Sequence, residues 1–486
     1  MQAILRHKET VPKWLNLAAL IILLASIAVA AATELYAVIA VPFGLLFIGW
    51  IILNWKSYYW FFAFSIATTG VVTLGSGSMY LPMMPLSIVS ALLALALLLY
   101  NRKIVYENFY RHPLTLIIFL QYFWLLISVI FSEIPVPSVK YLGVNTIQLL
   151  SFVLLPMMVL KREEDWMKLC RILLISFTLV AAYVVVRHAL KNFTYLYTNV
   201  AVKPFFYNHV DHGCIMSMLV PIPYMLWRHT DKSKVWTRRF YLLLLAFFII
   251  CTYLTFARAA ILAVAFAFVI VFAIRKQLVN WLMALFFIAC ISIVSYLVIN
   301  DNYKHFKPNY EQTYSRHSFD DLLKATFMGG DMSSMERFYR WIASARMSTE
   351  KPLTGVGPNN FYDFYKPHAV QMFRTYVSRN EEKSTTHNYF IFMLVEQGWP
   401  AMILYGILIW ALFFQAQKVY HKTKNVLYKR MALVGAMVIA AFFINNLFSE
   451  LLQTYKIGAI FYLAAVLIYW VGNQIKKENK TTALLP

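Results

Sequence analysis

The sequence predicts an all-α, polytopic membrane protein with 12–14 transmembrane helices and one large, partly helical extracytoplasmic loop. Of the 486 residues, 60% are hydrophobic and 14% are charged, and a soluble protein of this size could not bury so much apolar surface. The hydrophobic residues are gathered in runs close to the ~20 residues that a helix needs to cross a bilayer. One long polar passage, residues 300–386, interrupts these runs.

Up to fourteen runs qualify as spans. The first ends in AVAAATE, which is similar to a signal-peptidase site, but a second run follows almost at once, so we expect an uncleaved first helix. The runs at 58–74 and 259–274 are the weakest, and twelve spans remain without them. In chain order the predicted spans are residues 14–32, 36–54, 58–74, 82–100, 113–132, 144–160, 172–188, 210–227, 240–257, 259–274, 278–299, 389–414, 431–449 and 456–473.

Basic residues are distributed unequally between the two sides of these spans. The positive-inside rule assigns the side rich in Lys and Arg to the cytoplasm, which places both termini there and residues 300–386 on the extracytoplasmic face. The net charge of +22 is then mostly a topology signal, and such dispersed charges do not suit nucleic-acid binding. The basic side carries Arg6, Lys8, Lys13, Lys56, Arg102, Lys103, Arg111, Lys161, Arg162, Lys168, Arg171, Arg228, Lys232, Lys234, Arg238, Arg239, Arg275, Lys276, Lys418, Lys422, Lys424, Lys429, Arg430, Lys476, Lys477 and Lys480, whereas the short loops of the other side hold Lys140, Arg187, Lys191, Lys203, Arg258 and Lys456.

These features divide the chain into five regions. Residues 1–239 are an N-terminal transmembrane bundle, and 240–299 are a second transmembrane region. Residues 300–386 are the extracytoplasmic loop, 387–473 are the C-terminal transmembrane helices, and 474–486 are a cytoplasmic tail.

One cluster in the first half has the residue types of a metal site. His209, Asp211 and His212 open a predicted span on the outer face, but their spacing matches no metal motif, and residues i and i+2 diverge on a helix. We expect them to line the rim of an extracytoplasmic cavity or to have a structural role at the interface, with metal binding as the less favoured alternative. The four cysteines lie in or beside apolar runs without CxxC pairing, as buried packing residues do.

The stretch with the most chemistry is residues 335–396. Its first half predicts a short amphipathic helix that Pro352 ends. Gly355 and Gly357 then shape a turn that the backbone enters easily only with glycines. Residues 385–388, with the sequence TTHN, follow just before an apolar run, which predicts a threonine hydroxyl as the helix cap and His387 in the first helical turn.

This stretch resembles the O-antigen ligase and O-antigen polymerase superfamily. The resemblance lies in R-x-x-x-W…P-L-x-G-x-G-P-x-N-F followed by H-N-x-[YF]-x-x-x-L-x-E-x-G, and it covers roughly residues 240–398. Members of the family are integral membrane glycosyltransferases that move a glycan off an undecaprenyl diphosphate carrier. The matching residues are Arg337, Trp341, Pro352, Leu353, Gly355, Gly357, Pro358, Asn360, Phe361, His387, Asn388, Glu396 and Gly398.

The resemblance implies a bacterial inner-membrane enzyme of lipopolysaccharide biosynthesis, with an undecaprenyl-diphosphate-linked glycan as donor and a lipid or glycan as acceptor. An O-antigen ligase is the favoured reading, and a polymerase of repeat units or a protein O-glycosyltransferase stays open. A polysaccharide or lipid transporter is the rival class. Transporters commonly show internal repeats and ionisable groups near the midplane, which this sequence lacks, and a structural scaffold explains neither Arg258 nor His387.

Three arginines are the predicted diphosphate-binding residues, because a guanidinium stays charged and grips phosphate oxygens with a planar fork of donors. The family places a Ser-Arg or Thr-Arg pair between two close spans. Here Ala257 precedes Arg258, and Thr255 stands two residues further back. Arg337 belongs to the resemblance. Arg340 shares its helix face at i+3 but lies outside the resemblance, and a solvated arginine is the alternative reading for it.

His387 is the predicted catalytic base. In the first turn of a helix the macrodipole disfavours imidazolium, which keeps the ring neutral and able to accept a proton. Asn388 could orient the ring or contact sugar. Because a diphosphate is a good leaving group, we expect a single-step, inverting transfer that uses no protein nucleophile, metal or cofactor.

Overall fold

The computed structural model describes residues 40–483, except 75–76, 107–108, 308–331, 371 and 373–384, together with Ile21, Ala25, Ser26 and Val29. The chain divides into two compact units, residues 1–65 and 66–486, and each is described by itself.

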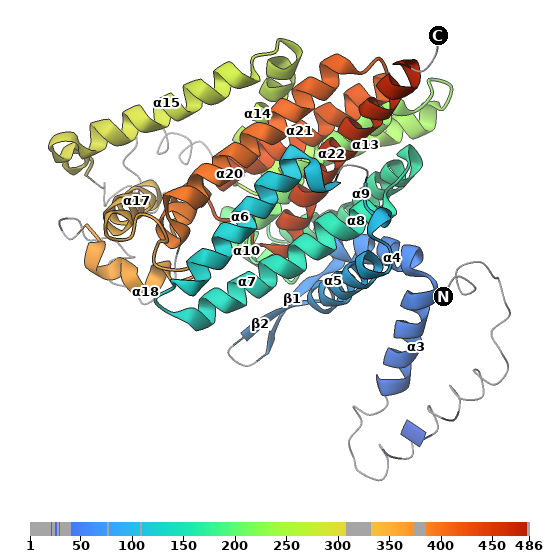
Figure 1. Ribbon diagram of the computed structural model, residues 1–486, viewed down its shortest axis with the longest axis horizontal. Coiled ribbons are helices and arrows are strands. Elements are labelled where there is room, and N and C mark those ends of the chain that lie inside the picture. Colours follow the sequence, from blue (N-terminus) through green and yellow to red (C-terminus); the bar gives the residue numbers. More distant parts are fainter. Residues whose placement is uncertain are drawn as a thin grey trace. The chain divides into compact units, whose positions relative to one another are not determined.

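The second unit is a bundle of membrane-spanning helices (Figure 1). Within the described residues, ten helices are long and apolar enough to cross a membrane, so the predicted all-α polytopic architecture is confirmed. The ten are α5 (Met83–Tyr100), α6 (Pro113–Ile130), the continuous run of α7 (Pro135–Leu149), a π-helical turn (Leu150–Leu154) and α8 (Leu155–Val159), then α9 (Glu163–Ala189), α13 (Val235–Leu254), α14 (Arg258–Arg275), α15 (Val279–Val298), α20 (Tyr389–Lys422), α21 (Val426–Asn446) and α22 (Tyr455–Ala483).

Shorter elements connect these spans. Two of them are the strands of a short hairpin, which pair antiparallel with Gly70 opposite Leu81 and Leu74 opposite Gly77. The shorter elements are α3 (Ala40–Leu53), α4 (Trp55–Thr68), β1 (Gly70–Leu74), β2 (Gly77–Leu81), α10 (Thr198–Ala201), α11 (His209–Leu219), α12 (Pro221–His229), α17 (Met332–Glu350), α18 (Phe361–Tyr365) and the 3₁₀ turns Arg102–Ile104, Phe109–Arg111, Tyr195–Tyr197, Ile299–His305 and Lys366–His368.

The described part of the first unit is apolar and aromatic. The ring of Phe47 lies 5.8 Å from that of Trp50 on α3, and both rings pack edge-on against Tyr58 and Phe61 of α4. Helix α3 is the described part of the predicted span 36–54. Apart from a few single residues, the predicted span 14–32 lies outside the described residues.

Two predicted spans have a different structure. Residues 58–74 are helical only as far as Thr68, and their last residues form β1 of the hairpin. Residues 210–227 form α11 and α12, which meet at Val220. Pro221 starts α12, and proline interrupts a continuous helix because it lacks the N–H and its ring clashes with the preceding turn.

The loops predicted to be cytoplasmic gather at one end of the bundle. Arg430 Nη1 donates to the carbonyl of Arg228 (2.6 Å), His421 Nε2 lies 2.8 Å from the carbonyl oxygen of Ile274, and Lys161 Nζ contacts the carbonyl of Ile104. α17 and α18 lie at the opposite end from the C-terminus of α22 (Figure 1). The polar loop and the basic loops are thus separated as the charge pattern predicts.

The centre of the bundle is formed by α20, α21 and α22, whose side chains are mostly buried. By contrast α15 exposes most of its apolar side chains, as expected of a lipid-facing helix. α20 consists of two helical parts joined at Gly398, which has a φ of +79°, two residues before Pro400. This kink of α20 lies close to the polar loop.

Candidate functional site

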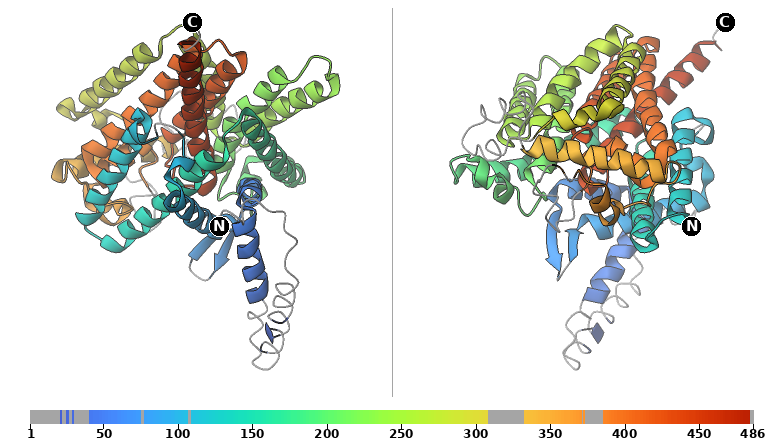
Figure 2. Two further views of the ribbon diagram at one scale, coloured as in Figure 1. Left: turned by 45° about the vertical axis from the view of Figure 1, so that its right-hand side comes forward. Right: turned by 90° about the vertical axis from the view of Figure 1, so that its left-hand side faces the viewer.

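The amphipathic helix α17 lies across the end of the bundle. It is seen end-on in Figure 1 and along its length in the right-hand view of Figure 2. Trp341 Nε1 donates to the carbonyl of Thr386 (2.9 Å), and Arg340 Nη1 donates to the carbonyl of Thr385 (3.3 Å). The predicted helix is therefore present, and it is joined to the segment that leads into α20.

The turn after α17 is docked on α20 through Glu396. This side chain is 1% exposed, and its carboxylate accepts hydrogen bonds from the N–H groups of Asn359 (2.6 Å) and Phe361 (3.1 Å). The N–H of Val356 donates to the carbonyl of Val395 (3.0 Å). A buried carboxylate is tolerated when such donors satisfy it, so Glu396 holds the loop in place.

Glycines permit this close approach. Gly355, Gly357 and Gly398 have φ values of +67°, +107° and +79°, a region that L side chains rarely adopt. A Cβ on Gly355 would overlap the carbonyl oxygen of Val395, and one on Gly398 would overlap that of Leu353. The conformations predicted for Gly355 and Gly357 are present, and they bring the loop backbone onto the kink of α20.

We expect Gly355→Ala to lower stability by at least about 2 kcal/mol, because it adds left-handed strain and overlaps main-chain atoms of α20 that cannot rotate away. The apparent melting temperature of the purified protein in detergent measures this loss. Gly143→Ala is the matched control, since a Cβ there meets nothing within 4 Å. Equal melting temperatures for the two variants would contradict the docked arrangement.

The same loop contacts the connection between α6 and α7. Asn360 Nδ2 donates to Ser132 Oγ (2.8 Å), and Ser138 Oγ donates to the carbonyl of Pro358 (2.7 Å). From the sequence, residues 131–137 are typical of a turn. The hydrogen bonds of Ser132 and Ser138 with a loop more than 200 residues away could not be predicted from it.

His387 lies just before α20 and not in its first turn, which corrects the predicted position. Asn388 is the N-cap, and its Oδ1 accepts hydrogen bonds from the N–H groups of Phe390 (2.9 Å) and Ile391 (3.2 Å). The predicted hydroxyl cap is therefore wrong, because the amide of Asn388 satisfies the first N–H groups in place of Thr386. His387 is half-buried and has a left-handed backbone with a φ of +53°.

The electrostatic environment of His387 is set by burial and by α17. Burial, followed by the charges of Arg340 and then Arg337, lowers the pKa of His387 to about 3. A pKa this low corresponds to a neutral ring at neutral pH, and its causes are desolvation and two arginines where the sequence suggested the helix macrodipole. Burial and the charge of Arg337 also lower the pKa of His209, so Arg337 acts on two histidines.

His209 belongs to the helix that packs against the start of α14. A Cβ on Gly213 of α11 would lie 2.8 Å from Thr255 Oγ1 and 2.9 Å from Ala257 Cβ, so a glycine is needed for this close packing. Arg258 follows directly as the first residue of α14 and is half-buried. The predicted break between two spans at Arg258 is present, with the displaced hydroxyl of Thr255 beside it.

The structure therefore brings Arg337, Arg340, His387 and Asn388 together where α17 meets α20. Arg258 lies at the start of α14. His209 connects the two places indirectly, because its helix α11 packs against α14 and the charge of Arg337 contributes to lowering its pKa. Within the described residues, no group of three or more His, Cys, Asp or Glu side chains is arranged to hold a metal ion.

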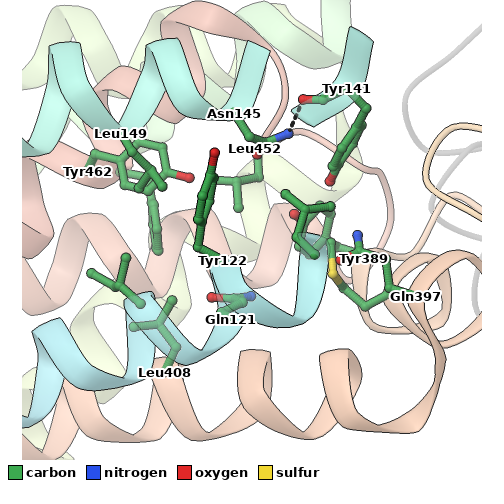
Figure 3. Close-up of a pocket in the computed structure, with 14 residues that line it drawn as sticks. Gln121, Tyr122, Tyr141, Asn145, Leu149, Tyr389, Gln397, Leu408, Leu452 and Tyr462 are labelled. Carbon is green, nitrogen blue, oxygen red and sulfur yellow. Dashed lines mark hydrogen bonds between the residues drawn. The ribbon is translucent and has the colours of Figure 1, made fainter. Parts of the chain in front are cut away.

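A separate cavity lies between α6, α7, α20 and α22 (Figure 3). Tyr389, Met393 and Gln397 of α20 line it, and Tyr122 and Tyr141 point into it from the neighbouring helices. No charged side chain is among its described lining residues. The cavity therefore lacks the cations that a diphosphate requires, and it does not replace the α17–α20 junction as the candidate site.

Two charged residues have structural positions that the sequence did not reveal. Lys456 is 2% exposed, and its Nζ donates to the carbonyls of Ala67 (2.8 Å) and Phe205 (2.7 Å), so it is not the outer-loop residue that the charge count suggested. Glu450 accepts hydrogen bonds from the hydroxyls of Thr385 and Thr386. Its only sequence signal is an isolated acid in the short polar stretch between two apolar runs.

Comparison with known proteins gives one family. Residues 242–406, which are 165 of the 486 residues, match the family model described as O-Antigen ligase. No curated protein matches the sequence. The matched segment contains α14, α17, the docked loop and the first half of α20, and thus the residues that carry the resemblance.

Proposed function

We propose that this multi-pass membrane protein, of which residues 242–406 match the O-antigen ligase family model, moves a glycan from an undecaprenyl diphosphate carrier to an acceptor hydroxyl. The reaction takes place on the extracytoplasmic face of the bacterial inner membrane. The observation that carries the proposal is the contact between α17, which holds Arg337 and Arg340, and the segment that contains His387 at the start of α20.

The arginines of this site hold the donor. Arg337 and Arg340 are on one face of α17 and present positive charge beside His387. Charge-assisted hydrogen bonds to phosphate oxygens are worth about 1.5–3 kcal/mol each, and they position the anomeric carbon of the sugar close to the imidazole. Arg258 adds a third cation from the start of α14.

Donor binding makes His387 a better base. In the donor-free protein burial and then the two guanidinium charges hold its pKa low. A diphosphate between them offsets those charges, so the pKa of His387 rises towards the ordinary histidine value of about 6.5. A base whose pKa lies closer to the working pH transfers protons more effectively.

Transfer then proceeds in one step. The acceptor oxygen forms a bond to the anomeric carbon while the bond from that carbon to the diphosphate oxygen breaks, and its electron pair leaves with undecaprenyl diphosphate. The acceptor proton passes to His387. Attack from the side opposite the leaving group inverts the anomeric centre, and no metal, cofactor or covalent enzyme intermediate takes part.

The acceptor follows from deletion of the gene and separation of the surface glycans by size. An O-antigen ligase, the member we favour, predicts loss of all long chains on the lipid core and accumulation of carrier-linked polymer. Single repeats on the core would identify a polymerase, and unchanged lipid glycans would identify a protein O-glycosyltransferase.

The proposed topology is tested with cysteines introduced on each side. We expect Lys366→Cys to react with an impermeant thiol reagent in intact spheroplasts, and Ser233→Cys to react only after the membrane is opened, because both positions are exposed. Wild-type protein is the control, because three of its four cysteines are buried and Cys290 is partly so. The reverse pattern would place His387 in the cytoplasm and end the proposal.

A further inference from the structure

Glu450 is surrounded by hydrogen-bond donors from the segment that contains His387. It lies in the short connection between α21 and α22, far from α17 in the sequence. Its Oε2 accepts a hydrogen bond from Thr385 Oγ1 (2.6 Å), and its Oε1 accepts from Thr386 Oγ1 and from the N–H of Asn388 (3.3 Å). One carboxylate thus binds residues on both sides of His387.

The segment is also bonded to α17 and, a second time, to the α21–α22 connection. Arg340 and Trp341 donate to the carbonyls of Thr385 and Thr386, and Asn388 Nδ2 donates to the carbonyl of Leu447 (3.1 Å). Residues 385–388 are therefore clamped between α17 and the α21–α22 connection.

This clamp explains the backbone of His387. A non-glycine residue with a φ of +53° is strained, and such a conformation persists only where the surroundings fix it. Thr386 and Asn388, the two neighbours of His387, both bind Oε1 of Glu450. Fixing both neighbours fixes the direction in which the imidazole leaves the main chain.

We propose that Glu450 is a positioning residue for glycan transfer, which holds His387 where it can take the proton of the acceptor. The inference rests on the proposed function. Glu450 does not touch substrate in this account, and its whole contribution passes through the 385–388 segment.

The chemistry of the side chain predicts a graded series of variants. Glu450→Gln keeps one acceptor oxygen for Thr386 and Asn388, and its amide can donate to the hydroxyl of Thr385, so it should retain transfer within about tenfold of wild type. Glu450→Ala removes every acceptor, and a displacement of about 1 Å at a reacting group costs on the order of 10²-fold. We expect that loss in the turnover number, with donor affinity nearly unchanged.

The deciding experiment is a double-mutant comparison of transfer rates at saturating donor. If Glu450 acts through His387, adding Glu450→Ala to His387→Ala lowers the rate no further. Independent action would multiply the two losses and overturn the inference. Thr386→Val, which removes one donor to Glu450, should show part of the Glu450→Ala loss, whereas Thr386→Ser should not.

Folding and the parent proposal are controlled separately. Glu350→Ala, an exposed glutamate of the same polar loop that pairs with His368, should behave as wild type. If Glu450→Ala does not fold, Thr386→Val carries the test, and wild-type turnover in Thr386→Val would then overturn the inference. Full transfer by His387→Ala itself would contradict the proposed function, while loss in His387→Ala with none in the Glu450 variants would contradict only the positioning role.

Discussion

Replacing His387 with alanine is expected to lower the turnover number of glycan transfer by roughly 10²–10⁴-fold, the range assigned to general base catalysis, while donor affinity changes little. The imidazole accepts the acceptor proton and makes no contact that the diphosphate needs. Single-turnover transfer rates and donor binding, measured on the same preparations, separate the two quantities.

The pH profile of the wild-type protein adds a second readout. Transfer requires neutral imidazole, so the rate falls as the pH drops through the pKa of His387. Burial, Arg340 and Arg337 lower this pKa to about 3 in the donor-free protein, and bound donor raises it. The acid limb of kcat, which reports the donor complex, should therefore lie at higher pH than the acid limb of kcat/KM, and both should vanish in His387→Ala.

His368→Ala is the matched control for this variant. His368 belongs to the same polar loop, but its ring contacts Glu350 and the carbonyl of Phe364, away from the α17–α20 junction. Equal loss of donor affinity and turnover in His387→Ala would make the imidazole a ligand of the donor. Near-normal turnover would remove His387 from the site.

Replacing Arg337 with alanine should weaken donor binding by about 10–100-fold, because it removes at least one charge-assisted hydrogen bond of about 1.5–3 kcal/mol. Arg337→Lys keeps the charge but lacks the planar fork, so its rescue should be incomplete. Equilibrium binding of the undecaprenyl-diphosphate-linked glycan measures both effects. Arg258→Ala is expected to act in the same direction.

Arg346 provides the control on the same helix. Its guanidinium donates to Tyr303 Oη (2.7 Å) and to the carbonyl of His368 (3.1 Å), away from His387, so Arg346→Ala should leave donor affinity unchanged. Loss of the Arg337 charge should also raise the pKa of His387 in the free protein and shift the acid limb of kcat/KM to higher pH. Unchanged donor affinity in Arg337→Ala would contradict the proposal that Arg337 binds the diphosphate of the donor.

Much of the fold follows from local sequence properties. Apolar runs of sufficient length predict spans, and ten such helices are present. Two apolar runs do not form single spans, for reasons that hydropathy does not take into account. Residues 70–74 pair with a partner strand, and Pro221 divides the run at 210–227 into two helices. Lys456 was assigned to a loop as a basic residue at the edge of an apolar run. Its burial could not be foreseen, because its carbonyl partners, Ala67 and Phe205, are distant in sequence.

The features of the site that depend on one residue, such as a glycine conformation, could be predicted from the sequence. The features that depend on contacts between distant residues could not. Gly355 and Gly357 adopt the expected left-handed conformations. The helix start near His387 was misplaced by two residues because Asn388, and not a threonine, is the cap. Glu450 could not be inferred, since its role depends on contacts across more than 60 residues.

The most direct test of the central claim is transfer by the purified protein in the presence of a strong chelator. The reaction contains an undecaprenyl-diphosphate-linked glycan and one of three acceptors, namely lipid core, a second donor molecule or a protein. The measured quantity is undecaprenyl diphosphate released per glycan transferred. We predict a ratio of one with one of these acceptors, at a rate that the chelator does not change and that falls by at least about 10²-fold in His387→Ala. Release of undecaprenyl diphosphate without transfer to any acceptor, or activity that a chelator abolishes and a divalent ion restores, would contradict the account.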